Sequence, residues 1–238
     1  MVESKSKNSE GHRQRLREKF LASGLSGFHD YEIIELLLTI GTPRKDCKEA
    51  AKASLEKFKT IQNVLEASSS DLMDVKGIGP KNIFGIKLIK AVADRYLEKR
   101  LIHKEAIKNS RELLDYLRSN IRNKKRECFK VIYLNAKNKV ISSETLFEGT
   151  LTSSSIYPRE VIKAAIKNNA AALIFAHNHP SGDPDPSPED FSITRKLYFA
   201  LRFVDVMVHE HLILGENAYF SFADNGIIEK YKHEYENR

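Results

Sequence analysis

Two histidines and an aspartate in the C-terminal half have side chains and a spacing that suit a metal ion. His177 and His179 lie two residues apart in AALIFAHNHP (171–180), and side chains two apart on a strand point the same way, so both imidazoles can reach one ion. Asp190 follows a loop (180–186) that is rich in glycine and proline and turns the chain back. Hydrolytic zinc sites use three protein ligands and keep one position for water. The segment therefore predicts a zinc site formed by His177, His179 and Asp190.

The pattern around these ligands matters more than any single residue in it. Ser187 and Asp190 are three residues apart on the first turn of the expected helix, so they share a face. A lone pair of histidines at a strand end is usually core or surface, and loop aspartates are often turn residues. The conjunction favours the metal site. A second pair, His209 and His211, has no SxxD after it, so we expect strand alternation, with at most one of the two beside the zinc ligands.

The N-terminal half is predicted to be helical. Apolar spacing and stop signals indicate helices over 30–40 and 47–58, and a long helix from Lys81 past Arg100. Ser69 or Ser70 is expected to cap a short helix before it. A linker near 101–110 and a helix over 110–123, capped by Ser110, complete the list of elements expected before the sheet.

The C-terminal half changes to a strand pattern. Residues 127–149 are rich in β-branched and aromatic side chains, with a polar turn over 135–138. The remaining expected elements are a helix over 159–170 with Pro158 near its start, a strand over 171–180 buried on both faces, a helix over 186–205 capped by Ser187, and strands over 208–215 and 218–223. The fold class is thus α/β, a mixed sheet with flanking helices, preceded by a small all-α domain. We expect domains over 1–105 and 106–230 and a frayed polar tail over 231–238.

A glycine-rich turn in the N-terminal half has the features of a helix–hairpin–helix. Gly77 and Gly79 would let the backbone approach a phosphate, and Lys76 and Lys81 would add charge. Residues 1–105 hold 20 basic and 15 acidic side chains, most of the chain's net charge of +7. These features predict sequence-independent DNA contact through this half. The alternative is a hairpin used only for packing or for holding a partner protein, and Asn82 stands where such motifs commonly have a small residue.

Composition limits the class of protein. The two cysteines, Cys47 and Cys128, lie far apart outside any CxxC, which argues against a disulfide framework and a thiolate zinc site. No apolar run approaches the roughly 20 residues of a membrane span, and the N-terminus lacks the apolar stretch of a secretory signal. We expect a cytoplasmic protein without membrane contact. The oligomeric state stays open.

The segment 177–190 resembles the JAMM (MPN+) metalloprotease signature, HxH followed by seven residues and SxxD. The wider chain resembles the bacterial RadC family, through GHRQRLREKF, KGIGPKNI and SFADNGII as well as the histidine segment. The resemblance implies a JAMM/MPN-like domain with cytidine-deaminase-like layering. It also implies zinc as cofactor, His177, His179 and Asp190 as its ligands, and Ser187 as a catalytic residue that binds the oxyanion.

The resemblance further implies an upstream glutamate as general base, acting on the zinc-bound water. Glu127 leads the first strand of the domain directly after a helix, which is where such proteins place the base; the competitors are Glu144, Glu148 and Glu160. The expected function is zinc-dependent hydrolysis of amide or isopeptide bonds in a protein or peptide substrate. The alternative is a DNA-repair-associated DNA-binding protein or nuclease, in which the metal domain is a scaffold or acts on nucleic acid.

Overall fold

The computed structural model describes residues 3–42, 46–106, 110–122, 124–149 and 156–237. The chain forms two compact units, Met1–Ala93 and Asp94–Arg238. This division falls inside a long helix, α6 (Pro80–Leu101), and differs from the expected boundary at 105/106. The reason is that Leu101 and Ala106 are buried in the core of the second unit, so the expected linker is part of that unit.

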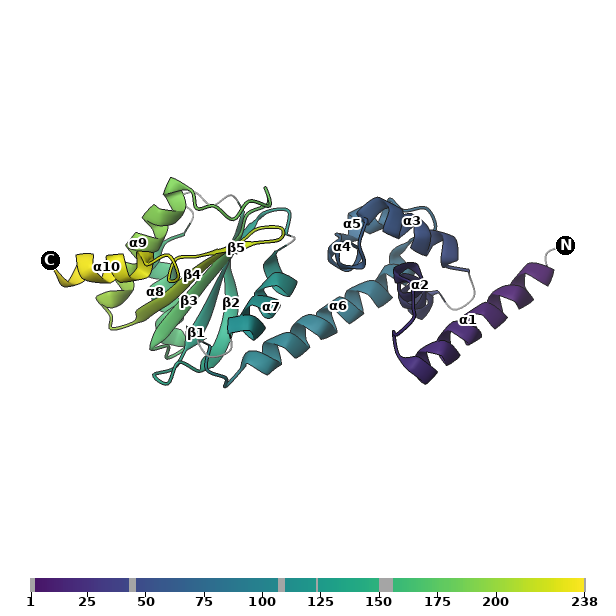
Figure 1. Cartoon of the computed structure of the whole chain (residues 1–238), viewed down its shortest axis with the longest axis horizontal. Helices are drawn as coiled ribbons and strands as arrows, with labels where there is room; N and C mark the ends of the chain where they lie inside the picture. The colour runs from purple at the N-terminus through teal and green to yellow at the C-terminus, as the bar shows by residue number, and fades with distance from the viewer. Residues whose placement is uncertain (1–2, 43–45, 107–109, 123, 150–155, 238) are drawn as a thin grey trace. The chain divides into compact units, whose positions relative to one another are not determined.

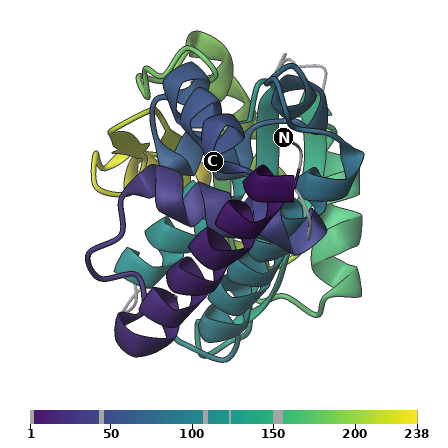
Figure 2. The same ribbon diagram turned by 90° about the vertical axis from the view of Figure 1, so that its right-hand side faces the viewer.

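The first unit is helical, as the sequence predicts. The expected helices are present as α2 (Asp30–Gly41) and α3 (Lys48–Phe58), and Ser68, one residue before the expected cap, accepts the N–H of Asp71 at the start of its short helix. The other helices of the unit are α1 (Glu3–Ser23), α4 (Ile61–Glu66), α5 (Ser69–Met73) and the first turns of α6 (Figures 1 and 2).

Two glycines let α2 and α6 touch backbone to backbone. A Cβ atom at Gly41 would collide with the carbonyl group of Lys81, and one at Gly85 would collide with the carbonyl oxygen of Leu37. In each helix, one glycine thus lies directly against the main chain of the other helix. This contact fixes the start of α6, directly after the glycine-rich turn, against the core of the unit.

The second unit is built on a five-stranded mixed sheet with the order β2-β1-β3-β4-β5. Its strands are β1 (Glu127–Leu134), β2 (Val140–Gly149), β3 (Ala172–Asn178), β4 (Met207–Leu214) and β5 (Tyr219–Ser221). β3 pairs antiparallel with β1 and parallel with β4, and every residue of β3 is buried, as its apolar run predicts. The sheet edges are formed by β2 and β5.

Helices cover both faces of this sheet (Figure 1). α7 (Ser110–Ile121) packs on one face and begins at the serine expected to cap it. α8 (Pro158–Lys167) and α9 (Pro188–Arg202) pack on the other, over a core that includes Phe129, Phe175 and Leu197. The predicted α/β class is confirmed. In the described part of the chain, no helix combines the length and apolar character needed to cross a membrane.

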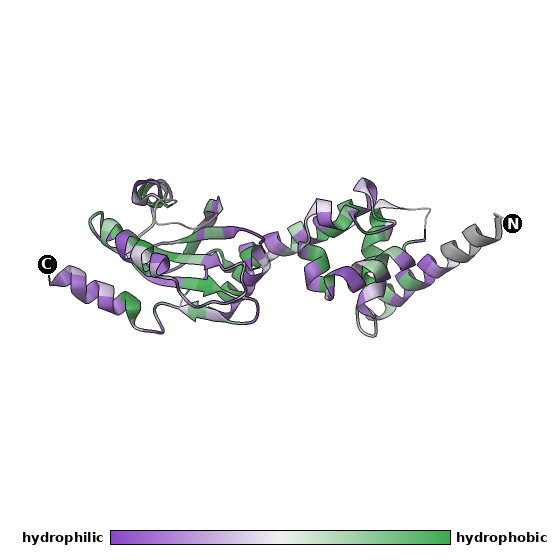
Figure 3. Cartoon of the chain, turned by 90° about the horizontal axis from the view of Figure 1, so that it is seen from above, coloured by the Kyte–Doolittle hydropathy of each residue, from purple (hydrophilic) through white to green (hydrophobic). Residues whose placement is uncertain are grey.

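The C-terminal residues expected to fray form an ordered helix, α10 (Ile227–Glu236). Its outer face is polar (Figure 3), but Tyr231 is buried, with its ring beside that of Tyr198 on α9, and its hydroxyl donates to the carbonyl of Phe191. Tyr235 lies edge-on to Phe199. The expectation of a frayed tail was wrong over the described residues 231–237, because Ile227, Ile228, Tyr231 and Tyr235 pack against the core of the unit.

Candidate metal centre

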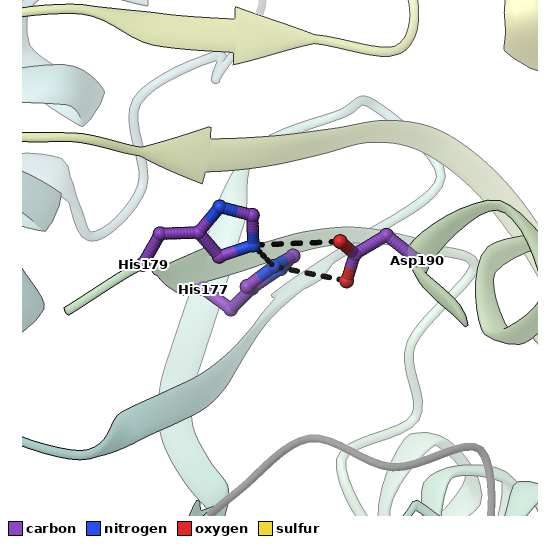
Figure 4. A group of neighbouring side chains, drawn as sticks. All are labelled: His177, His179 and Asp190. Carbon is purple, nitrogen blue, oxygen red and sulfur yellow. Dashed lines mark hydrogen bonds and ion pairs between the residues drawn. The ribbon is translucent and has the colours of Figure 1, made fainter. Parts of the chain in front are cut away.

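Three side chains predicted to bind zinc converge at the end of β3. Figure 4 shows the imidazoles of His177 and His179 facing the carboxylate of Asp190, which stands on the first turn of α9. Their ligand atoms all lie within 4.8 Å of one another. Nε2 of His177 is 3.1 Å from Nε2 of His179 and 3.1 Å from Oδ1 of Asp190. Nε2 of His179 is 3.4 Å from Oδ2 of Asp190.

These three distances fit a zinc ion. Ligands bound at about 2.0–2.1 Å to a tetrahedral zinc are roughly 3.3 Å apart, which is close to each of these separations; the two that involve Asp190 end on different oxygens of its carboxylate. Two nitrogens and one carboxylate oxygen are also ligands that zinc prefers. His177 is fully buried, whereas the side chain of His179 is 14% exposed, so the triangle borders solvent at His179. The donor set therefore suits one ion that keeps a position for a further ligand.

The loop between the ligands returns the chain onto the same edge of the sheet. Gly182 takes a positive φ of 85°, which glycine adopts without strain. Its carbonyl accepts the N–H of Glu216, and its N–H donates to the carbonyl of His179. Ser187 then caps α9, because its hydroxyl oxygen accepts the N–H of Asp190. The cap places the Asp190 carboxylate in front of the two histidines.

Ser187 also contacts the metal-binding carboxylate directly. Its hydroxyl lies 2.6 Å and its backbone nitrogen 2.8 Å from Oδ2 of Asp190, and both donate to that oxygen. The structure thus places Ser187 at the site, as expected, but with its hydroxyl bonded to a candidate ligand. Its predicted role in binding an oxyanion stays a prediction.

The histidine pair on β4 divides as the sequence suggests. His211 is fully buried, and its Nε2 lies 2.8 Å from Nδ1 of His177. Nδ1 of His211 lies 2.6 Å from the hydroxyl of Thr194, which donates to the carbonyl of Asp190. His209 instead contacts the Asn138 amide, in the turn between β1 and β2. Of the two histidines on β4, His211 is therefore the one that contacts a candidate metal ligand.

Burial and hydrogen bonding set the ionisation of the site. Desolvation lowers the pKa of His177 and keeps its ring neutral. Desolvation acts in the same direction on His179, but hydrogen bonds to Asp190 and to the carbonyl of Asp183 outweigh it, and the pKa of His179 is raised. Desolvation acts to raise the pKa of Asp190, but hydrogen bonds from both histidines prevail and lower it. A carboxylate facing imidazoles is the charge arrangement that attracts a cation.

Glu127 lies on the same face of the sheet as the histidines. It begins β1, and alternation places it with Phe129, whose ring lies beside that of His177 at a centroid distance of 6.4 Å. Its negative charge acts to raise the pKa of both His177 and His179, as a nearby carboxylate would. The assignment of Glu127 as the general base stays a prediction.

The competing glutamates have other partners. Glu144 accepts the hydroxyl of Tyr133 at 2.6 Å. Glu148 forms an ion pair with Lys124 at 3.1 Å and pairs with Cys128, whose side chain belongs to the α7 face. Glu160 is exposed on α8 beside Arg159. The contacts of all three lie outside the group of His177, His179 and Asp190.

The glycine-rich turn of the first unit is a tight hairpin between α5 and α6. Lys76, Gly77 and Lys81 are exposed, and Gly77 has a positive φ of 91°. Asn82 is buried, however, and its Oδ1 accepts the N–H of Gly79 at 2.7 Å. Its Nδ2 donates to the carbonyl of Gly77 at 3.1 Å. The N–H of Gly79, expected to face a phosphate, is thus bonded within the protein, whereas Lys76, Gly77 and Lys81 stay exposed.

Two polar residues at the site were missed by sequence reasoning. Asn178 lies between the two histidines on a strand expected to be buried, and the available signal was that a buried amide needs partners. Thr194 lies one helical turn after Asp190, and this spacing on a shared face was the available signal. Both are fully buried.

Comparison with known proteins places this geometry in a family. A family model described as a RadC-like JAB domain matches residues 107–227, and one described as UPF0758 N-terminal matches residues 10–84. A UPF0758 protein of Fusobacterium nucleatum is 44% identical over 93% of this chain and 99% of its own length. UPF0758 proteins of Pseudoalteromonas translucida and Ruegeria pomeroyi are 42% and 39% identical over 90% and 91% of this chain, and over 96% and 97% of their own lengths.

The chain belongs to the RadC-like UPF0758 family. The resemblance based on HxH, SxxD and the hairpin is thereby confirmed, and the second unit is a JAB domain with the JAMM/MPN fold. The names of these UPF0758 relatives state no substrate. What the RadC-like site does must therefore be argued from its residues.

Proposed function

We propose that this protein is a zinc-dependent hydrolase that cleaves amide or isopeptide bonds. The observation that carries the proposal is the convergence of His177, His179 and Asp190, whose ligand atoms are separated by distances close to those between the ligands of a tetrahedral zinc. Zinc would supply a Lewis acid there, which lowers the pKa of a water toward about 7 and polarises a carbonyl group.

The protein groups around the triangle would then divide the work. Glu127 accepts a proton from the attacking water and returns it to the leaving nitrogen. The hydroxyl of Ser187 turns from Asp190 toward the carbonyl oxygen and stabilises its growing negative charge. Asp190 keeps its hydrogen bond from the backbone nitrogen of Ser187 during this change.

A nuclease is less well supported. Enzymes that act on phosphate esters often bridge two metal ions with carboxylates. Among the described residues, one cluster of side chains could hold a metal ion, and it consists of His177, His179 and Asp190. DNA contact through Lys76 and Lys81 remains compatible with a hydrolase, as a separate role of the first unit. Both cysteines are buried and lie far apart in the sequence outside any CxxC, which suits the reducing cytoplasm that we propose as the location of the protein.

Metal analysis with a substrate screen tests the hydrolase. The full chain should hold about one zinc, and Asp190→Ala should remove it. The loaded protein should then be tested on peptides, isopeptide-linked conjugates and DNA, with Glu127→Gln as the matched inactive variant. Full zinc occupancy in Asp190→Ala would show that the ligand set is wrong, and cleavage of DNA alone would favour the nuclease.

A further inference from the structure

We propose that Asn178 is a positioning residue that holds Glu127 in register with the metal ligands by fastening the backbone on both sides of it. The inference rests on the proposed function, because it takes Glu127 as the general base. It assigns to the residue between the two histidines a purpose beyond spacing them.

The contacts of Asn178 are directed at the chain around Glu127. Oδ1 of Asn178 accepts the N–H of Cys128 at 2.8 Å. Nδ2 donates to the carbonyl oxygens of Lys124 at 3.0 Å and Arg126 at 3.3 Å. One side chain thus bonds the residue before Glu127, the residue after it, and the turn that leads into β1. Asn178 is fully buried, so these bonds form away from competing water.

The three hydrogen bonds of Asn178, which we call the clamp, begin where the backbone pairing of β1 with β3 ends. β1 and β3 pair from Leu134 and Ala172 to Lys130 and Ala176, and the paired register stops three residues short of Glu127. Asn178 continues the connection with its side chain. On its other side, this end of β1 is paired with β2, through Glu127 with Gly149, Cys128 with Glu148 and Phe129 with Phe147, so Asn178 supplies the connection on the β3 side.

Strand alternation makes this arrangement possible. The side chain of Asn178 points to the opposite face from its neighbours His177 and His179, toward the face that Cys128 shares with α7. Glu127 points to the face of the histidines. The same segment of the chain can therefore present His177 and His179 on one face of the sheet and, from the other face, bond the backbone on both sides of Glu127.

Catalysis depends on such positioning, since a misplacement of about 1 Å can lower a rate roughly 10²-fold. The isosteric variant Asn178→Asp keeps an oxygen for Cys128 but turns a second oxygen toward the carbonyls of Lys124 and Arg126. Asn178→Ala removes all three bonds. Asn168→Ala is the matched control, because Asn168 also makes two side-chain bonds, to Ser142 and Ala164, but near the other end of β1.

We expect both Asn178 variants to bind zinc with wild-type affinity. Their KM for the substrate should stay unchanged, while kcat falls about 10²-fold. Asn168→Ala should keep kcat. In zinc-loaded crystals, the Glu127 carboxylate should move by about 1 Å relative to the histidines in Asn178→Ala, and the amide of Cys128 should exchange hydrogen faster. A melting temperature for each variant reports whether it is folded.

The outcomes separate the two proposals. An unmoved Glu127 carboxylate or an unchanged kcat in Asn178→Ala would overturn the clamp. Loss of zinc to the extent seen in His179→Ala would also overturn it, because Asn178 would then act on the ligands. A wild-type protein without hydrolytic activity would end the proposed function, and the crystal structures and hydrogen exchange would still decide whether Asn178 positions Glu127.

Discussion

Nε2 of His211 lies 2.8 Å from Nδ1 of His177, at the buried side of the candidate metal centre. A histidine that binds a metal through Nε2 carries its hydrogen on Nδ1, so His177 would donate to His211. His211 would in turn donate from its own Nδ1 to the Thr194 hydroxyl oxygen. Phe222 stacks on the His211 ring, with a centroid distance of 4.9 Å, and holds it in place.

His211→Phe should therefore weaken zinc binding about 10- to 100-fold, because His177 would lose the partner that orients its ring. Affinity can be measured by competition with a chromogenic chelator. His209→Phe is the control, since His209 contacts Asn138 and should bind zinc as the wild type does. Equal affinities for the two variants would contradict the role assigned to His211.

Glu127→Gln should keep about one zinc per chain and lower kcat by about 10²- to 10⁴-fold, the usual contribution of a general base. Glu144→Gln and Glu148→Gln, whose carboxylates are engaged by Tyr133 and Lys124, should keep both zinc and activity. Zinc content and turnover of the same preparations decide the assignment. A larger loss in Glu144→Gln would show that the wrong glutamate was chosen.

Zinc binding should release a proton from His179. The pKa of its ring is raised above the ordinary 6.5, so the metal-free protein still carries this proton as the pH rises past that value. His177, with a lowered pKa, is already neutral there. Affinity should consequently fall as the pH decreases through the raised pKa of His179. Calorimetry in buffers of different ionisation enthalpy measures the proton; a heat independent of buffer near pH 6.5 would contradict this expectation.

Lys130→Met should change how the stability of the JAB domain depends on pH. Lys130 is buried, desolvation lowers its pKa below 10.5, and its ammonium group donates to Asn120. The unfolded chain thus binds more protons than the folded one between the lowered pKa and 10.5, so wild-type stability contains a term that rises with pH in that window. Thermal melts across it should show a smaller rise in Lys130→Met. Identical slopes would show that Lys130 ionises normally.

Lys76→Glu with Lys81→Glu should weaken DNA binding by the full chain. The slope of log K against the logarithm of the salt concentration should become less steep by about two, one for each lost phosphate contact. Lys137→Glu with Lys163→Glu makes the same change of charge on exposed lysines of the other unit. Fluorescence anisotropy with a short duplex at several salt concentrations gives both slopes. Equal effects of the two pairs would indicate a general charge effect, and the hairpin would then be a packing element.

The elements of the site were predictable from sequence because they depend on local patterns. The apolar run of β3, the glycine and proline residues after it, and Ser187 with Asp190 each determine structure within a few residues. The HxH and SxxD motifs lie close together in the chain, so the position of the triangle of ligands followed from them.

The supporting contacts depend on pairing between distant strands, which the sequence does not display. His211 reaches His177 only because β4 lies parallel to β3 with His177 opposite Ile213. Asn178 is bonded to Cys128, 50 residues earlier in the chain. The cap at Ser68 was misplaced because three serines follow one another and each can cap a helix. α10 was missed since most of its residues are polar, and its apolar anchors, Ile227, Ile228, Tyr231 and Tyr235, are set among charged side chains.

The contact between α9 and α10 offers a spectroscopic opportunity. α9 carries Asp190 at its first turn, and Phe203, at its other end, lies edge-on to Tyr235 of α10. The chain has nine tyrosines and no tryptophan. Phe203→Trp would therefore introduce a sole indole, excited apart from the tyrosines, on the helix that bears a candidate ligand. Its emission and quenching would register a shift of α9 when an ion is added, in real time and before any substrate is known.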